Sequence, residues 1–130
     1  MSQTFKKYEH LCHKKVIESL FDRSNVKNKS FSVYPIRVIY NSYKTEGNDK
    51  QEFPQVLFSV SKRSFKRAVD RNLIKRRLRE SYRLNKSSLK GLRLNVVFLF
   101  TSREILSYDK IEGSMKVILQ RLSENDGQLV

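Results

Sequence analysis

The sequence predicts an α+β fold, a two-layer α/β sandwich in which helices pack on a mixed sheet of about four strands. Apolar residues recur at helical spacing in three segments, and short β-branched and aromatic runs lie between these segments. The most apolar run, residues 94–101, is hydrophobic on both faces, as expected of an interior strand. A strand, a helix and another strand follow one another in the second half of the chain, which favours a crossover unit covered by helices.

The first half of the chain predicts a helix followed by strands. Residues 9–22 carry apolar side chains with helical spacing in their second half, so we expect a first helix there. Residues 32–43 alternate between apolar and more polar positions, which predicts a strand with one wetter face, and residues 28–33 are compatible with a further short strand. Residues 45–51 are polar and typical of a turn. Residues 55–61 predict the next strand by their alternation.

The second half predicts two further helices around the most apolar strand. Residues 68–83 form one uninterrupted amphipathic pattern, and we expect this helix to end near residues 85–88. The strand at residues 94–101 follows. Ser107 is a suitable N-cap for a last helix, whose apolar residues recur at core spacing as far as Leu122. The predicted sandwich therefore contains three helices.

The composition describes one basic domain of 130 residues. The chain has 27 Lys and Arg against 13 Asp and Glu, a formal net charge of +14. Residues 61–90 hold twelve of these basic residues and only two acidic ones. A charge so large and so localised is the electrostatic footprint of a nucleic-acid-binding protein. We expect residues 1–130 to form a single RNA-binding domain, with residues 1–8 and 123–130 as flexible ends.

Composition also bears on the compartment. A basic membrane-surface helix is disfavoured because the core needs the apolar face of that helix. Cys12 is the only cysteine, which excludes an internal disulfide and fits a reducing compartment. No apolar segment typical of a signal peptide follows Met1, and the longest apolar run, residues 96–100, is too short to span a bilayer. We expect a cytoplasmic protein with no membrane partner.

The predicted helix at residues 68–83 carries an unusual row of charge. Six basic side chains lie within thirteen positions: Arg71, Lys75, Arg76, Arg77, Arg79 and Arg83. On a helical wheel, five of them share an arc of roughly 140° with Asn72. The apolar residues that we expect on the opposite, core side are Val69, Leu73, Ile74, Leu78 and Leu84, and of these we expect Leu73 at the exposed rim. Like charges one turn apart repel each other, so folding alone does not require this row, whereas binding to a polyanion does.

The same segment resembles a known family. Residues 68–80 read AVDRNLIKRRLRE, and residues 58–63 before them read FSVSKR. Together they resemble the signature of the protein component of bacterial ribonuclease P, an RNA-based enzyme that trims the 5′ leader from precursor tRNA. Two positions depart from the family pattern. Leu73 stands where the family usually has Arg, and Phe65-Lys66-Arg67 replaces a Gly-Asn pair, so we expect a different turn into the helix.

The resemblance implies a fold, a division of labour and partners. It implies a ribosomal-protein-like domain with a left-handed βαβ crossover, where the pattern alone would assign the right hand. Catalysis would belong to the RNA with Mg²⁺, so the protein itself would have no catalytic residue and bind no cofactor alone. The implied partners are the catalytic RNA subunit and precursor tRNA, with no obligate protein partner.

Two sets of candidate binding residues follow. Basic side chains neutralise phosphates, and Arg suits bidentate contacts. The candidates for binding the RNA subunit are Arg67, Arg71, Asn72, Lys75, Arg76 and Arg79. Single-stranded RNA instead requires aromatic and apolar platforms flanked by positive charge. By the resemblance, the candidates for binding the leader are Ile17, Phe21, Ile36, Val38, Tyr40, Lys62 and Arg63. A solvated basic face is the alternative for the first set, and a place in the core is the alternative for the apolar residues of the second.

Other chemistries are not indicated. The four glycines are scattered, so no glycine-rich phosphate loop is present. His10, Cys12 and His13 do not converge on a helix, and we expect neither a metal site nor a catalytic residue. A ribosomal or ribosome-assembly protein that binds rRNA is the main alternative function. A DNA-binding regulator is disfavoured because a buried strand, not a partner helix, follows the basic helix.

Overall fold

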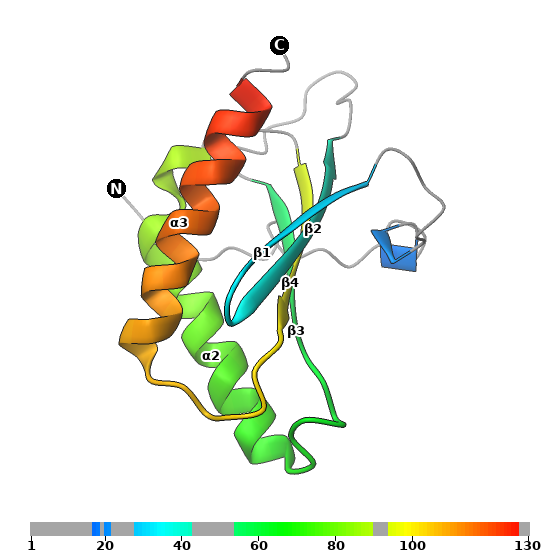
Figure 1. Ribbon diagram of the computed structural model, residues 1–130, viewed down its shortest axis with the longest axis vertical. Coiled ribbons are helices and arrows are strands. Elements are labelled where there is room, and N and C mark those ends of the chain that lie inside the picture. The colour runs from blue at the N-terminus through cyan, green and yellow to red at the C-terminus, as the bar shows by residue number, and fades with distance from the viewer. Residues whose placement is uncertain (1–16, 19, 22–27, 43–53, 90–93, 128–130) are drawn as a thin grey trace.

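The computed structural model describes residues 17–18, 20–21, 28–42, 54–89 and 94–127 (Figure 1). Its elements in chain order are β1 (Lys29–Val33), β2 (Ile36–Ser42), β3 (Gln55–Val60), α2 (Ala68–Asn85), the 3₁₀ turn η2 (Lys86–Leu89), β4 (Leu94–Phe100) and α3 (Tyr108–Gly127). From the strands onward, this order agrees with the predicted one and includes the additional short strand β1.

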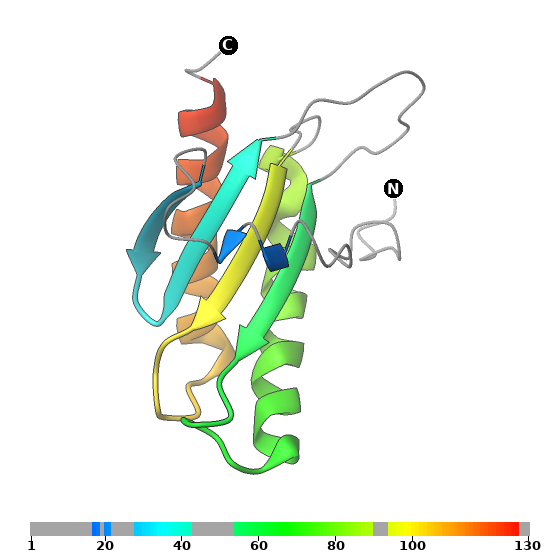
Figure 2. The same ribbon diagram turned by 90° about the vertical axis from the view of Figure 1, so that its right-hand side faces the viewer.

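The four strands form one mixed sheet in the order β1-β2-β4-β3. β2 lies antiparallel to both β1 and β4, whereas β3 and β4 are parallel. Neighbouring parallel strands need a long connection, which α2 provides. Figures 1 and 2 show α2 and α3 side by side on one face of the sheet. The α+β class and the four-stranded mixed sheet are confirmed, and the left hand of the β3–α2–β4 crossover stays a prediction.

The described part of the chain contains two long helices rather than the three that we expected. The missing one, predicted for residues 9–22, lies mostly outside the described residues. Ile17, Glu18 and Leu20 are helical, and the amide of Phe21 donates a hydrogen bond to the carbonyl of Ile17 at 3.3 Å. The first helix is therefore described only in this short piece.

The main core lies between the sheet and the two helices. Alternate side chains of each strand point into it, as the pleat of a strand requires. From α2 come Ile74, Leu78 and Tyr82, spaced at i, i+4 and i+8 and completely buried. The ring of Tyr82 lies 5.9 Å from that of Phe58 in β3 and 5.7 Å from that of Phe98 in β4, measured between centroids. Burying one such side chain contributes about 1.5–3 kcal/mol, so this layer holds the orientation of α2 firmly.

The buried stripe of α2 is rotated from the one that we expected. Val69 is 67 % exposed and Leu84 is 38 % exposed, although we placed both on the core side. Leu73, which we expected at the rim of that side, is half-buried. The reason is Tyr82, which belongs to the buried row and moves the centre of the stripe away from Val69 and Leu84. The apolar positions that we selected omitted this tyrosine.

α3 closes the other half of the core and is longer than expected. The amide of Lys110 donates to the Oγ of Ser107 at 3.4 Å, in agreement with the expected N-cap. The predicted apolar positions are all buried: Ile111, Met115, Ile118, Leu119 and Leu122. The helix then continues to Gly127, so residues 123–127, which we expected in a flexible end, are helical.

Candidate RNA interface

The side of α2 that faces away from the core carries cations in contact with solvent. Asn72, Arg76 and Arg79 are exposed, and Lys75 is half-buried beside them. Within the part of the chain that the structure describes, Lys75, Arg76 and Arg79 have no hydrogen-bond or ion-pair partner. Positive side chains displayed on one rigid helix and directed to solvent are well placed to neutralise a row of phosphates.

Arg71 belongs to the same predicted set but makes contacts inside the protein. Its Nη1 donates to the carbonyl oxygens of Phe65 and Lys66, at 2.8 and 2.9 Å. The N-cap residue of α2, Arg67, has no side-chain capping bond of its own. Arg71 therefore fastens the β3–α2 connection, residues 61–67, to the first turn of α2. This is also where the sequence departs from the family's Gly-Asn pair.

Two further basic residues of α2 have partners in the protein. Nη1 of Arg77 donates to the carbonyl of Leu106, which ties α2 to the connection between β4 and α3. Arg83 forms an ion pair with Glu80. Their hydrogen bond lowers the pKa of the Glu80 carboxyl and raises the pKa of Arg83. The basic residues of α2 thus form two groups, which we call the internal group (Arg71, Arg77 and Arg83) and the solvent-facing group (Lys75, Arg76 and Arg79).

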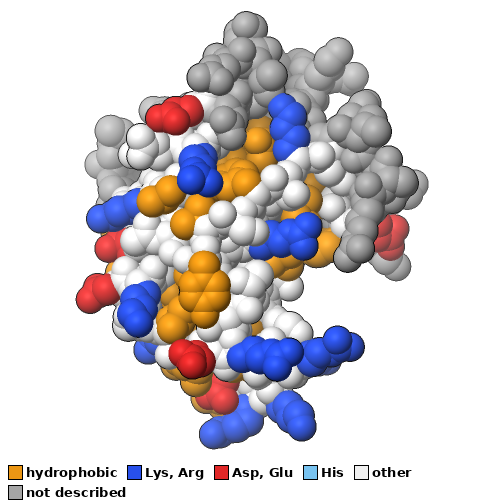
Figure 3. All heavy atoms as spheres, viewed as in Figure 1, with side chains coloured by type: hydrophobic (Ala, Val, Ile, Leu, Met, Phe, Trp, Pro, Cys, Tyr) orange, Lys and Arg blue, Asp and Glu red, His pale blue; other side chains and the backbone are white. Residues whose placement is uncertain are grey.

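The β3–α2 connection adds a basic cluster at the start of the helix. Lys62, Arg63, Lys66 and Arg67 are all exposed. The backbone amide of Arg63 donates to the Oγ of Ser61 at 3.1 Å, which shapes the turn directly after β3. Figure 3 shows Lys and Arg side chains gathered at the end of the molecule where this connection meets α2. Positive charge therefore continues from the helix to the end of the sheet.

The sheet face opposite α2 and α3, which we call the outer face, has its own small apolar cluster. Leu20 and Val97 are buried there, and Ile17 is half-buried against them. Phe21, beside them in sequence, is 46 % exposed. The strands complete the cluster with Ile39, Leu57 and Leu99. Figure 2 views this face, with the described N-terminal residues in blue in front of the strands.

Our assignment of the leader to one face of β2 requires a correction. Ile36 and Val38 are completely buried and Tyr40 is 5 % exposed, all in the main core against the helices. Their burial supports the alternative of a core role, because no ligand reaches them. β2 presents Arg37 and Ile39 to the outer face instead. Arg37 could have indicated from the sequence which face of β2 is the outer one, because Arg is rarely buried without a partner.

A row of amide side chains crosses the outer face where β2 ends and β4 begins. Nδ2 of Asn95 donates to Oδ1 of Asn41 at 3.1 Å, and Nδ2 of Asn41 donates to Oδ1 of Asn28 at 2.9 Å. Sequence reasoning missed this row because the three residues are far apart in the chain and meet only through the strand register. It makes one end of the outer face polar but uncharged, while the other end meets Lys62 and Arg63.

The described residues form neither a metal-ion cluster nor a membrane-spanning helix. Across the described ranges, no three His, Cys, Asp or Glu side chains are grouped to hold a metal ion. His10, Cys12 and His13 lie outside those ranges. The described helices include none with the length and hydropathy needed to span a membrane.

The fold and this surface together indicate the class of protein to which the chain belongs. A mixed sheet with two helices on one face, a basic helix edge and a partly apolar outer face is the arrangement of an RNA-binding α+β domain.

Comparison with known proteins supplies the family. Residues 5–123 match the family model described as Ribonuclease P. The ribonuclease P protein component of Porphyromonas gingivalis is 34 % identical over 105 residues, which cover 76 % of this chain and 74 % of the relative. That of Finegoldia magna is 35 % identical over 102 residues, which cover 78 % of each chain. The chain belongs to the ribonuclease P protein family, as the signature in α2 predicted.

Solved structures agree in fold. The ribonuclease P protein of Staphylococcus aureus aligns with a TM-score of 0.67 and 20 % identity, covering 88 % of this chain and 94 % of that one. The protein from Thermotoga maritima aligns with a TM-score of 0.67 and 16 % identity, covering 86 % and 96 %. Family membership makes this chain a protein component of an RNA-based endoribonuclease that processes tRNA.

Proposed function

We propose that the solvent-facing group of α2 binds the catalytic RNA subunit and that the outer face binds the 5′ leader of precursor tRNA. One observation carries the first half of this proposal. Lys75, Arg76 and Arg79 lie within the family signature, and the described part of the chain offers none of them a partner. Asn72 and Arg67, both exposed, extend the same surface toward the β3–α2 connection.

The physical role of these cations is electrostatic. Each phosphate that a Lys or Arg neutralises releases condensed counterions, which favours binding at low salt. Fixed cations also replace part of the Mg²⁺ that a folded RNA otherwise needs to bring its phosphates together. In this proposal Mg²⁺ and the catalytic groups belong to the RNA-containing holoenzyme, and the protein alone holds no cofactor and cleaves nothing.

The second half of the proposal rests on the chemistry of the outer face. Phe21, 46 % exposed, offers a ring on which an unpaired base stacks, and Ile17 with Ile39 forms an apolar floor beside it. Lys62 and Arg63 supply exposed positive charge just past the end of β3. A single strand that crosses this face therefore meets an apolar platform and then cations for its phosphates.

Reconstitution tests the first half. Purified protein is added to its cognate RNA subunit and precursor tRNA at low Mg²⁺, and 5′ cleavage is measured. We expect stimulation by the wild-type protein, reduced stimulation with Arg79→Ala, and full stimulation with the matched control Lys116→Ala. Lys116 is an exposed lysine of α3, outside the signature. Cleavage by the protein without RNA, or equal loss in both variants, would contradict the proposal.

Leader binding is tested by comparing two substrates. The holoenzyme should bind precursor tRNA more tightly than mature tRNA, and Phe21→Ala should reduce that preference while leaving the affinity for mature tRNA unchanged. Changing Lys62 and Arg63 to Ala should do the same through lost phosphate contacts. If both changes weaken the binding of precursor tRNA and of mature tRNA equally, the leader does not lie on this face.

The family match favours this function over the alternative of an rRNA-binding ribosomal protein. We further propose that residues 1–130 act as one domain in the cytoplasm, and that the RNA subunit and precursor tRNA are the only partners that the chain requires.

A further inference from the structure

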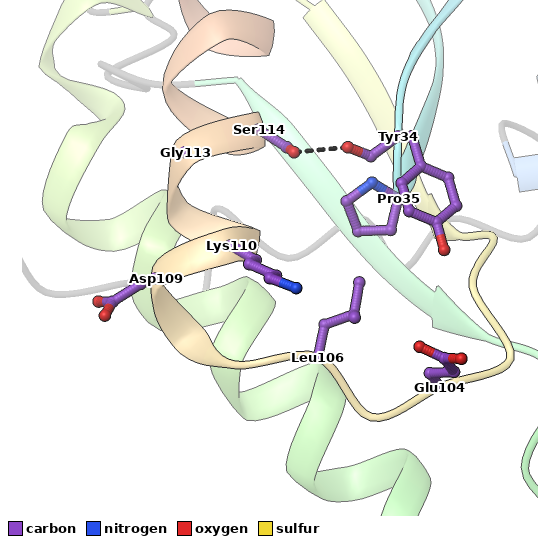
Figure 4. A pocket seen from close by; sticks show the side chains of 8 residues that line it. All are labelled: Tyr34, Pro35, Glu104, Leu106, Asp109, Lys110, Gly113 and Ser114. Carbon is purple, nitrogen blue, oxygen red and sulfur yellow. Dashed lines mark hydrogen bonds between the residues drawn. The ribbon is translucent and has the colours of Figure 1, made fainter.

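A hollow lies between the β1–β2 turn, the β4–α3 connection and the start of α3. Its volume is about 520 Å³, within the usual range of small-ligand sites. Figure 4 shows the side chains that line it. Pro35, Leu106 and Gly113 give it apolar surface, and Glu104 and Lys110 are its charged members. None of these residues belongs to the RNA-subunit or leader surfaces proposed above.

The most unusual member is Tyr34, whose ring is exposed yet anchored. The residue is 68 % exposed. Its hydroxyl donates to the Oγ of Ser102 at 3.1 Å, and its carbonyl accepts from the Oγ of Ser114 at 2.6 Å. The next carbonyl, that of Pro35, accepts from both the amide and the Oγ1 of Thr101, at 2.8 and 3.0 Å. Four hydrogen bonds thus hold the turn in place, and the ring keeps a fixed position while its surface stays open to solvent.

The wall beside Tyr34 is fixed in the same way. The amide of Glu104 donates to the Oγ of Ser102 at 3.0 Å, so the hydroxyl that receives Tyr34 also shapes the turn that carries Glu104. Arg77 of α2 holds the carbonyl of Leu106 on the same connection. The hollow is therefore built before any ligand arrives, and it is joined to the basic helix through Arg77.

The charged side chains of the hollow disfavour a phosphate group and favour the hydrogen-bonding edge of a nucleotide base. Among the described lining residues, Glu104 and Asp109 are acidic and Lys110 is basic, and Figure 4 shows the Asp109 carboxylate directed away from the hollow. One negative and one positive side chain therefore face the hollow, so an anion gains little here. A guanine base matches the set: its ring stacks on an aromatic side chain, its N1–H and N2–H₂ groups are donors for a carboxylate, and its O6 accepts from an ammonium group. Lys110 and Glu104 lie on different sides of Leu106, as Figure 4 shows.

We propose that this hollow binds a single unstacked guanine nucleotide of an RNA held by the protein, with Tyr34 as the stacking platform and Glu104 and Lys110 at the base edge. The inference rests on the proposed function, because it supposes that RNA lies along α2. It adds a base-specific site to a protein whose other proposed surfaces recognise only phosphates and unpaired strands.

The test is a titration of the ¹⁵N-labelled full-length protein with guanosine 5′-monophosphate, with the adenosine, cytidine and uridine monophosphates in parallel. We expect the guanosine nucleotide to shift the amide signals of Leu106 and Ser114 at lower concentration than the other three. Tyr34→Ala should weaken this binding about tenfold, as loss of one stacked base does, whereas Tyr34→Phe should retain most of it. Glu104→Gln should reduce the preference for guanosine.

One control variant, Gly113→Leu, and a comparison with the cleavage assay make the titration decisive. A Cβ added at Gly113, which lines the hollow, meets no heavy atom within 4 Å, so this position has room for a side chain. Gly113→Leu should therefore fill the hollow and abolish the shifts even if Tyr34→Ala fails to fold. Shifts confined to α2, or equal for all four nucleotides and unaffected by Gly113→Leu, would overturn the inference. A protein that supports tRNA cleavage but shows no shift at the hollow retains its proposed function and loses only this site. Shifts at the hollow without any stimulation of cleavage overturn the proposed function alone.

Discussion

The two groups of basic residues on α2 are alike in sequence and different in the folded protein. In the internal group, Arg71 and Arg77 donate to backbone carbonyls and so fasten α2 to neighbouring connections, whereas Arg83 pairs with the Glu80 carboxylate within the helix. The solvent-facing group has no such partner in the described part of the chain and remains directed to solvent. Some basic residues of an RNA-binding helix therefore stabilise the fold, and others are available to bind RNA. A count of basic residues does not distinguish the two roles.

The largest expected effect comes from removing the solvent-facing group as a whole. Changing Lys75, Arg76 and Arg79 together to Ala should weaken binding of the RNA subunit about 100-fold, at roughly 1 kcal/mol for each lost phosphate contact. The free energy of unfolding should stay the same or rise slightly, because like charges one turn apart are removed. Filter binding and urea denaturation measure the two quantities. Normal affinity in this variant would show that the group is only solvated surface.

Arg71 should behave in the opposite way. Arg71→Ala leaves the carbonyls of Phe65 and Lys66 without their donor, so we expect the free energy of unfolding to fall by about 1–3 kcal/mol. Arg71→Lys, which keeps a donor of the same charge, should recover part of the loss, and Arg76→Ala serves as the control without a structural contact. Denaturation midpoints in urea decide the matter. An Arg71→Ala protein as stable as wild type would remove the structural role.

Leu73 lies between the two groups and marks the main departure from the family signature. It is half-buried, at the border of the solvent-facing surface. Leu73→Arg should therefore tighten binding of the RNA subunit by up to about tenfold and change the free energy of unfolding by less than about 1 kcal/mol. Thermal melts and RNA titrations of the same variant test this. A large fall in melting temperature without tighter binding would mean that the leucine is needed in the core.

The smallest effect concerns a tyrosine beside the Glu80–Arg83 pair. Burial, together with a hydrogen bond to Glu112, raises the pKa of Tyr108 to about 12, against about 10 in an unfolded chain. The folded state then holds the phenolic proton more tightly, so its contribution to stability is complete below pH 10 and is lost as the pH rises from 10 to 12. The free energy of unfolding, measured by denaturation at several pH values in this range, should depend less on pH for Tyr108→Phe than for wild type. Identical pH profiles for both proteins would exclude the shift.

Much of the fold follows from local pattern. The alternation in β3, the doubly apolar β4 and the core spacing of α3 were each recognised from residues close together in the chain. The basic signature in α2 gave the family for the same reason, since its chemistry is carried by consecutive turns of one helix.

The remaining errors are non-local. Both faces of β2 carry apolar residues, so which face meets the helices depends on the side of the sheet where α2 and α3 pack. The orientation of α2 depended on Tyr82, whose place in the core is set by the rings of Phe58 and Phe98 from two other elements. The internal role of Arg71 could not be predicted because it requires the path of the connection before the helix.

The division of α2 into two groups is tested most directly by salt dependence. Two variants remove the same charge: Arg76→Gln with Arg79→Gln from the solvent-facing group, and Arg77→Gln with Arg83→Gln from the internal group. The affinity for the RNA subunit is measured for both and for wild type as the salt concentration rises. We predict that the slope of log affinity against log salt falls by about two for the first variant and stays at the wild-type value for the second. Equal slopes for the two variants would contradict the division.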